Sequence, residues 1–245
     1  MRRAPPEFAD MLSKQGRALL TRRTSPRLTP AAPFVAHDSL LDAQKSRALL
    51  GLMNRHLFST LKPMVDPIPK WTIAGMQENY GELLPKTVRV LTATFDSPRS
   101  RSWQRAAEIG VIAMLQSPSM REFAQKLSGY ALRDEWGVQA LCYRPGDYAG
   151  PHNDHHPEDA EARQGYVDVH LTFATDAVDS QLLVYERKGH LSEVRPLNTC
   201  GGVTCYRLPF WHYTTPLLAK PGRAAAAKRW VLLSTFLDQG TRGLE

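Results

Sequence analysis

The stretch CYRPGDYAGPHNDHH, residues 142–156, carries the pattern that decides how the fold of this chain is interpreted. It places His152 and Asp154 two positions apart, directly after a strand-like segment and a turn that contains Pro145 and Gly146. Side chains two positions apart on an extended segment point to the same side, so an imidazole and a carboxylate can bind one metal ion together. The spacing therefore predicts two ligands of a metal site.

A third ligand has to come from a distant part of the chain. His212, in the segment LPFWHYTTP (208–216), is the best candidate because it lies on a late strand of the same predicted sheet. Two histidines and one carboxylate on one face leave coordination positions open, and this arrangement suits a non-haem Fe(II) centre. The alternative is that His152, His155 and His156 form a solvated polar turn, because His-x-Asp pairs also occur by chance.

Short segments rich in Val, Leu, Thr, Tyr and Phe dominate the C-terminal half, and turn-like stretches separate them. We predict strands at 137–143, 166–173, 181–186, 202–208, 211–218 and 229–237. No helical pattern lies between these strands. The chain is therefore predicted to be α+β with a mainly β core, an antiparallel double sheet or barrel, and with N-terminal helices packed on one sheet.

Helices are expected before this β region. The first is predicted to begin at a cap formed by Asp38 or Ser39 and to end near Leu61. Two more are predicted at 103–116 and 119–127, the last one ending near a glycine.

Around the His-x-Asp pair the chain resembles the Fe(II)/2-oxoglutarate-dependent dioxygenases, and among them the prolyl-hydroxylase-like branch. That branch typically has a Tyr, a Pro-Gly turn, a second Tyr and then His-x-Asp. The corresponding residues of this chain are Tyr143, Pro145, Gly146, Tyr148, His152 and Asp154. The resemblance implies a single dioxygenase domain over 37–245, with helical support at 37–136 and a double-stranded β-helix (jelly-roll) core at 137–238.

The resemblance also implies a cosubstrate anchor. In the family a Pro follows the distal His by four residues and a basic residue opens the last strand; here His212 precedes Pro216, and Arg229 opens RWVLLSTFLD (229–238). Arg229 would pair with the distal carboxylate of 2-oxoglutarate, a role that suits a planar guanidinium. The link between His212 and Arg229 is longer than usual, so Arg223 is a rival. We favour Arg229, because a strand fixes a side chain better than a Gly/Ala loop does.

Further pocket residues follow from the same resemblance. Tyr143 would donate its hydroxyl to 2-oxoglutarate, although a core aromatic is the alternative, and Thr172 would lie near the cosubstrate. In YVDVHLTF (166–173) every second side chain is apolar, and by the resemblance the polar side chains between them point into the barrel. Weaker candidates for contact with the substrate are Tyr148, Asp168 and His170.

The resemblance implies a requirement for Fe(II), 2-oxoglutarate and O2, with release of succinate and CO2. Asp154 argues for hydroxylation, with desaturation or ring closure as alternatives, since halogenases of this superfamily replace this carboxylate. The substrate class expected first is a small molecule such as an amino acid or a natural-product intermediate. Hydroxylation of a protein or peptide side chain and a catalytically silent jelly-roll domain for binding or sensing remain alternatives. A nucleic-acid repair dioxygenase is disfavoured, because alanines replace the Asn and Thr expected between Arg223 and Arg229.

The first 36 residues are predicted to form a basic arm and a Pro-rich linker outside the domain. Residues 1–30 hold seven basic and two acidic side chains, and residues 24–36 hold three prolines. The arm lacks interleaved aromatics, so we expect a solvated tail rather than a contact with nucleic acid. Deletion of residues 1–30 is then expected to leave the stability of the core nearly unchanged.

The composition fits an ordinary globular protein of 245 residues, with 42% hydrophobic and 22% charged side chains. No run approaches eighteen apolar residues, and no apolar stretch follows the N-terminal arginines, so neither a membrane partner nor a secretory signal is expected. The three cysteines, Cys142, Cys200 and Cys205, form neither an even set nor a CxxC pair. This pattern predicts a reducing, cytoplasmic location.

Overall fold

The structure is a computed structural model that describes residues 3–23, 27–29, 31–67, 87–154 and 165–238. Its strands are β1 (Phe34–His37), β2 (Lys62–Pro67), β3 (Thr87–Thr94), β4 (Leu132–Tyr143), β5 (Tyr148–His152), β6 (Tyr166–Ala174), β7 (Val178–Ser180), β8 (Leu182–Arg187), β9 (His190–Pro196), β10 (Cys200–Leu208), β11 (His212–Thr214), β12 (Leu218–Ala219) and β13 (Arg229–Asp238). Its helices are η1 (Phe8–Met11), α1 (Lys14–Leu20), α2 (Ala43–Leu52), η2 (Met53–Leu57), η3 (Phe58–Thr60), α3 (Arg101–Glu108), α4 (Val111–Leu115), α5 (Pro118–Ser128) and η6 (Ala224–Ala226).

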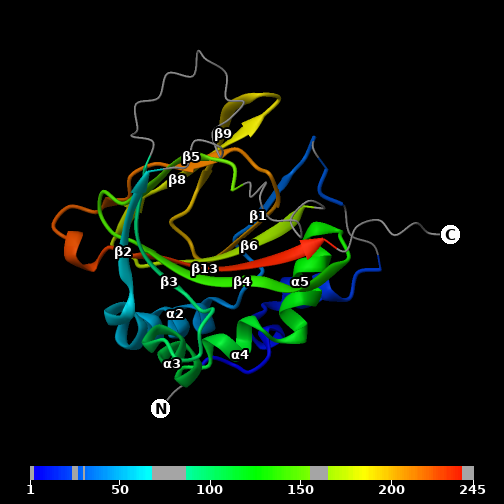
Figure 1. Ribbon diagram of the computed structural model, residues 1–245, viewed down its shortest axis with the longest axis horizontal. Helices are drawn as coiled ribbons and strands as arrows, with labels where there is room; N and C mark the ends of the chain where they lie inside the picture. Colours follow the sequence, from blue (N-terminus) through cyan, green and yellow to red (C-terminus); the bar gives the residue numbers. More distant parts are fainter. Residues whose placement is uncertain (1–2, 24–26, 30, 68–86, 155–164, 239–245) are drawn as a thin grey trace.

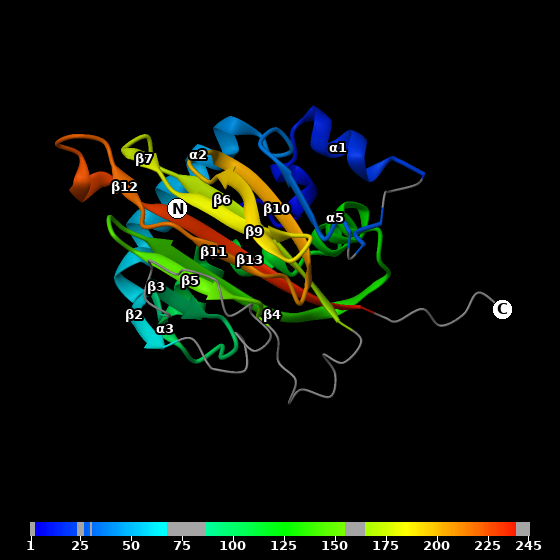
Figure 2. The same ribbon diagram turned by 90° about the horizontal axis from the view of Figure 1, so that it is seen from above.

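One curled antiparallel sheet contains most of the strands, in the order β1-β10-β6-β13-β4-β3-β5-β11-β8-β9, and β2 pairs with β3 off this path. Strand β3 joins the two parts of the curl, because it pairs with β4 along one stretch and with β5 along another. In Figure 1 the strands β4, β6 and β13 lie between the helices and the strands β5 and β8. Figure 2 shows β10, β6 and β13 running side by side. The predicted double-stranded β-helix core with helices on one sheet is confirmed.

Strand β6 shows why this sheet has an apolar outer face and a polar inner face. Val167, Val169, Leu171 and Phe173 are fully buried and belong to the large hydrophobic cluster that also contains helix residues. The side chains between them point the other way, into the curl, because successive side chains of a strand alternate in direction. The alternation read from YVDVHLTF is therefore confirmed.

The helices form largely where the sequence predicts them, with different ends. Asp42 is the N-cap of helix α2, and its carboxylate accepts hydrogen bonds from the backbone N–H groups of Gln44 and Lys45. The predicted cap at Asp38 or Ser39 is therefore wrong. Pro118 opens α5, and Gly129 ends it in the left-handed conformation. These are the residue types that favour a helix start and a helix end.

The helix predicted at 103–116 is instead two helices, α3 and α4, separated by Gly110. Gly110 has φ 82°, and a Cβ atom there would lie 2.7 Å from the carbonyl oxygen of Ala4. The backbone N–H of Ala4 donates to the carbonyl of Ile109 beside it, at 2.6 Å. The close approach of the N-terminal segment therefore requires a glycine and ends the first helix.

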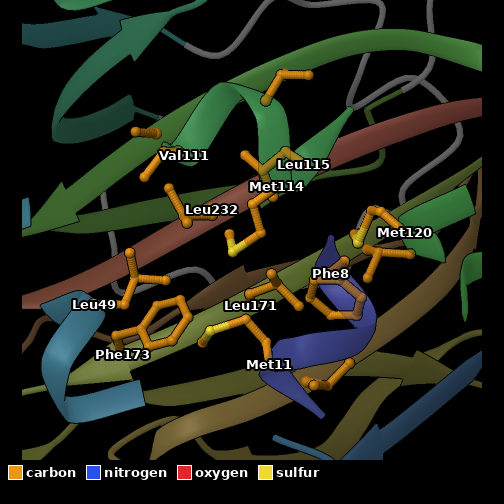
Figure 3. Packing of buried hydrophobic residues seen from close by; sticks show 14 of the residues in the cluster. Phe8, Met11, Leu49, Val111, Met114, Leu115, Met120, Leu171, Phe173 and Leu232 are labelled. Carbon is orange, nitrogen blue, oxygen red and sulfur yellow. The ribbon is translucent and has the colours of Figure 1, made fainter. Parts of the chain in front are cut away.

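The prediction of a solvated arm over residues 1–36 is wrong for the part that the structure describes. Phe8, Met11 and Leu12 are at most 2% exposed and belong to the main hydrophobic cluster. In Figure 3, Phe8 and Met11 lie among core residues of β6 and the helices. Strand β1 begins within the predicted linker, 24–36, and pairs with β10. The basic side chains obscured the apolar positions between them, and these positions decide the packing.

We therefore expect Phe8→Ala to lower the free energy of unfolding by about 3–5 kcal/mol, the usual range for removing a buried phenylalanine. The Phe8 ring is fully buried and its centroid lies 4.9 Å from that of Phe123. Denaturant unfolding measures the change. Val194→Ala, at a position 55% exposed, is the matched control and should change stability by less than about 0.5 kcal/mol. Similar effects of the two substitutions would mean that the N-terminal segment does not pack.

Strands β2 and β3 occupy a region that the sequence analysis assigned to helical support, and β5 and β9 also escaped prediction. The two prolines in β2 argue against a strand when the sequence alone is considered. They are tolerated because β2 pairs with β3 only and lies off the main path of the sheet. Among the described residues, none of the helices combines the length and the apolar character that a membrane crossing requires.

Candidate active site

Three predicted ligands meet at the junction of two neighbouring strands. His152 is the last residue of β5 and His212 the first of β11, and the register of these paired strands places the two residues opposite each other. Their ring centroids are 4.3 Å apart. Asp154 follows β5 in a left-handed conformation with φ 53°, which Asp tolerates better than most residues. One ligand atom from each of the three residues lies within 4.8 Å of the others.

The backbone fixes how both imidazoles face this point. His152 Nδ1 lies 2.6 Å from the carbonyl oxygen of Gly150, and His212 Nδ1 lies 2.7 Å from that of Phe210. Because a carbonyl only accepts, each Nδ1 carries the proton and each Nε2 is turned toward Asp154. The distances from Nε2 to the carboxylate are 3.2 Å for His152 and 3.7 Å for His212.

The electrostatics of the group attract a cation. Burial and the neighbouring His152 lower the pKa of His212 to about 3, so this imidazole is neutral at physiological pH. Burial alone would raise the pKa of Asp154, but His152 and His212 outweigh it and hold this pKa below its ordinary value. Burial alone would lower the pKa of His152, but Asp154 outweighs burial, and the net result is a pKa above the ordinary value. The carboxylate of Asp154 is thus ionised, and the deprotonated form is the one that binds a metal ion.

This donor set fits iron. Two imidazole nitrogens and one carboxylate on one side of an ion form the facial arrangement of non-haem Fe(II) sites, and no thiol is present to favour zinc or copper. The hydrogen bonds from Nδ1 to backbone carbonyls hold each ring in the orientation that ligation needs. His152, Asp154 and His212 are the residues that could hold the ion.

These three residues line a cavity of about 890 Å³ inside the curled sheet. Arg229 lines the same cavity, although it is only 3% exposed. Its guanidinium carbon lies 4.3 Å from the centroid of the Tyr143 ring on the neighbouring strand β4. Burial lowers the pKa of Arg229 to about 10, so the side chain still carries its charge at neutral pH. A buried cation facing a cavity can bind an anion.

The rival anchor Arg223 is elsewhere. It lies on the surface, and its guanidinium donates to both carboxylate oxygens of Asp176, at 3.0 and 3.1 Å. It is not among the described residues that line the cavity. The geometry therefore favours Arg229 over Arg223 as the cation that faces the site.

Gln181 is a site residue that the sequence analysis missed. It is 1% exposed, and its Oε1 accepts a hydrogen bond of 2.6 Å from Nε of Arg229. Its Nε2 donates to the backbone carbonyls of Asp147 and Thr215, at 3.2 and 3.0 Å. These bonds fix the amide, which in turn fixes Arg229 through Nε, so the bond to Gln181 uses neither terminal nitrogen. The only signal in the sequence was a polar residue at the start of a predicted strand.

The remaining predicted residues divide into two groups. The residues that line the cavity are Tyr143, Asp168, His170 and Thr172. Burial raises the pKa of Tyr143, and its hydroxyl bonds with Thr214. Tyr148 is not among the described lining residues; its hydroxyl lies 2.7 Å from Thr87 Oγ1. A substrate contact through Tyr148 thus has no support in the structure.

Comparison with proteins of known structure identifies the class of fold. No protein-family model and no curated protein sequence matches the chain. An oxidoreductase of the 2OG-Fe(II) oxygenase family from Burkholderia pseudomallei superposes with a TM-score of 0.53 at 14% identity, covering 99% of this chain and 97% of that one. The non-heme α-ketoglutarate-dependent epimerase SnoN from nogalamycin biosynthesis gives 0.52 at 15% identity, covering 91% and 83%.

The carbocyclase SnoK, also α-ketoglutarate-dependent and from nogalamycin biosynthesis, gives a TM-score of 0.51 at 14% identity and covers 96% of this chain and 87% of its own. At these identities the similarity establishes the fold. The protein has the jelly-roll fold of the 2-oxoglutarate- and Fe(II)-dependent oxygenases, and it places a His-Asp-His group inside that fold.

Proposed function

We propose that the protein is an Fe(II)- and 2-oxoglutarate-dependent oxygenase that hydroxylates an unactivated C–H bond of a small molecule and releases succinate and CO2. One observation carries the proposal: His152, Asp154 and His212 face one another in the cavity that also contains the buried Arg229. The shared fold supports it. The similar structures SnoN and SnoK are an epimerase and a carbocyclase from nogalamycin biosynthesis, and this similarity favours a small-molecule substrate over a peptide.

Each residue has a distinct part in this proposal. His152, Asp154 and His212 hold the iron, which when bound supplies the activation of O2. Arg229 binds the distal carboxylate of 2-oxoglutarate with its terminal nitrogens. The ring face of Tyr143 stabilises the guanidinium through a cation–π contact. Thr172 lies beside this end of the cavity, opposite Val231 of β13. Apolar walls, including Leu141, Val231 and Leu233, exclude water from the space between these groups.

Succinate release tests the proposal. The iron-loaded protein is incubated with 2-oxoglutarate and a panel of free amino acids and peptides, while succinate and the gain of one oxygen atom are followed by mass spectrometry. Succinate should form only when O2 is present. Products on peptides alone would favour the peptide hydroxylase, and no succinate above the iron-free control would favour a catalytically silent binding domain.

Gln181→Leu is expected to raise the KM for 2-oxoglutarate about tenfold, because Arg229 loses the bond that orients it and a hydrogen bond to a charged group contributes about 1.5–3 kcal/mol. The value of kcat and the affinity for iron should stay within about twofold of the wild type, since Gln181 touches none of the three ligands. A general structural effect would change all three quantities together. An unchanged KM would contradict the positioning role.

A further inference from the structure

A buried carboxylate lines the cavity near the end of β13 that is remote from Arg229. Asp168 lies on β6 and faces the cavity opposite Thr235 of β13. It is 4% exposed, and its Oδ1 accepts a hydrogen bond of 2.6 Å from the hydroxyl of Thr235. Its Oδ2 lies 3.9 Å from His170 Nε2, and the same nitrogen lies closer, at 2.9 Å, to the hydroxyl of Tyr206. One carboxylate oxygen is therefore available to a ligand.

The charges that line the cavity separate into two ends. Among the described lining residues, the acidic ones are Asp96, Asp154 and Asp168, and Arg229 is the one Lys or Arg. Arg229 precedes Thr235 by six positions on β13, a distance of roughly 20 Å along a strand. The described part of the chain brings no Lys or Arg into an ion pair with Asp168. Burial and the charge of Asp154 raise the pKa of Asp168, although His170 acts in the opposite direction. A ligand cation would stabilise the ionised carboxylate.

Space for the rest of such a ligand lies two strands from the carboxylate, on the other side of Thr235. Gly137 of β4 is opposite Thr235 in the sheet and lines the cavity. A Cβ atom at Gly137 would meet no other atom within 4 Å. Gln139, the next inward position on β4, can add hydrogen bonds to a polar group there. Its Nε2 donates to Thr92 Oγ1 at 2.7 Å, and among the described residues no donor lies within hydrogen-bond distance of its Oε1.

This end of the cavity is also connected to the candidate metal site. The hydroxyl of Tyr206 lies 2.9 Å from His170 Nε2, and the Tyr206 ring centroid lies 5.2 Å from that of His212. A cationic group bound at Asp168 would therefore place the neighbouring carbon atoms of the same molecule on the side of the three ligands.

We propose that the substrate carries a protonated amine and that Asp168 binds this ammonium group. Binding of an amine at Asp168 does not depend on the proposed oxygenase function. Only the statement that this amine is oxidised rests on that function. Asp168 is then a specificity-determining residue, which selects an amine over an alcohol of the same shape.

Matched probes test this inference by isothermal titration calorimetry on the full-length protein, anaerobic and loaded with Fe(II) and 2-oxoglutarate. The probes are hexylamine with 1-hexanol and 2-phenylethylamine with 2-phenylethanol. In at least one pair the amine should bind tenfold or more tightly than the alcohol. Asp168→Asn, which keeps the shape and the acceptor for Thr235, should remove this preference. Equal binding within both pairs, no measurable amine binding, or a preference that survives Asp168→Asn would overturn the proposal.

A second variant covers the case in which Asp168→Asn fails to fold. Gly137→Val adds a side chain where no atom lies within 4 Å, and valine suits a strand. It should weaken amine binding at least tenfold and leave 2-oxoglutarate binding unchanged, and unaltered amine binding would contradict the placement. The titrations are repeated on the metal-free protein, because an amine preference there would stand even if the oxygenase proposal failed.

Discussion

Asp154→Asn is expected to weaken Fe(II) binding at least 100-fold and to abolish O2-dependent succinate formation. The substitution removes the single negative charge among the three ligands, and metal affinity depends strongly on a deprotonated, charged donor. Asparagine keeps the side-chain shape and tolerates the left-handed backbone at this position, where φ is 53°. The loss should therefore come from the charge and not from the backbone.

Two measurements separate these causes. The metal-free variant should unfold at a denaturant concentration close to that of the metal-free wild type, which shows that the fold is kept. Iron content after anaerobic loading and desalting then reports the site alone. A variant that retains both iron and O2-dependent turnover would remove Asp154 from the metal site.

The second large effect is expected at Arg229. Arg229→Met should raise the concentration of 2-oxoglutarate needed for half-maximal turnover about 100-fold or more, because two charge-assisted hydrogen bonds to one carboxylate are lost together. Methionine fills part of the volume over the Tyr143 ring, and the ring stacking of the guanidinium is lost with the charge. Arg229→Lys restores the charge without the planar fork and should recover only part of the affinity.

Arg223→Met is the matched control. Arg223 pairs with Asp176 on the surface, and such exposed ion pairs contribute little. The requirement for 2-oxoglutarate should change by less than twofold. The reverse pattern, with a large effect at Arg223 and a small one at Arg229, would exchange the roles of the two arginines.

The site was predictable from sequence where short-range rules apply. The spacing of His152 and Asp154 predicts two neighbouring groups, and the structure places them together. Asp154, however, lies beyond the end of β5 in a left-handed conformation and not on an extended segment. His212 needed the resemblance as well as its place on a late strand. Their geometric meeting is confirmed, and their role in binding metal is a proposal. Gln181 could not be predicted, because its importance comes from tertiary contacts with Arg229 that no local pattern encodes.

The fold was predictable for the same reason in the C-terminal half, where alternation of apolar side chains reveals strands such as β6 and β13. The prediction from sequence was wrong at the N-terminus. There, positive charge was taken as a sign of solvent exposure, whereas Phe8, Met11 and Leu12 are buried. Net charge describes the outer face of a segment, and the buried face depends on what packs against it.

The most direct test of the metal centre is an anaerobic titration of the metal-free protein with Fe(II), monitored by isothermal titration calorimetry. We expect one ion bound per chain in the wild type, and at least 100-fold weaker binding in each of the variants His152→Ala, Asp154→Asn and His212→Ala. A wild type that binds no Fe(II), or three variants that bind it as tightly as the wild type, would contradict the claim that these residues form one iron site.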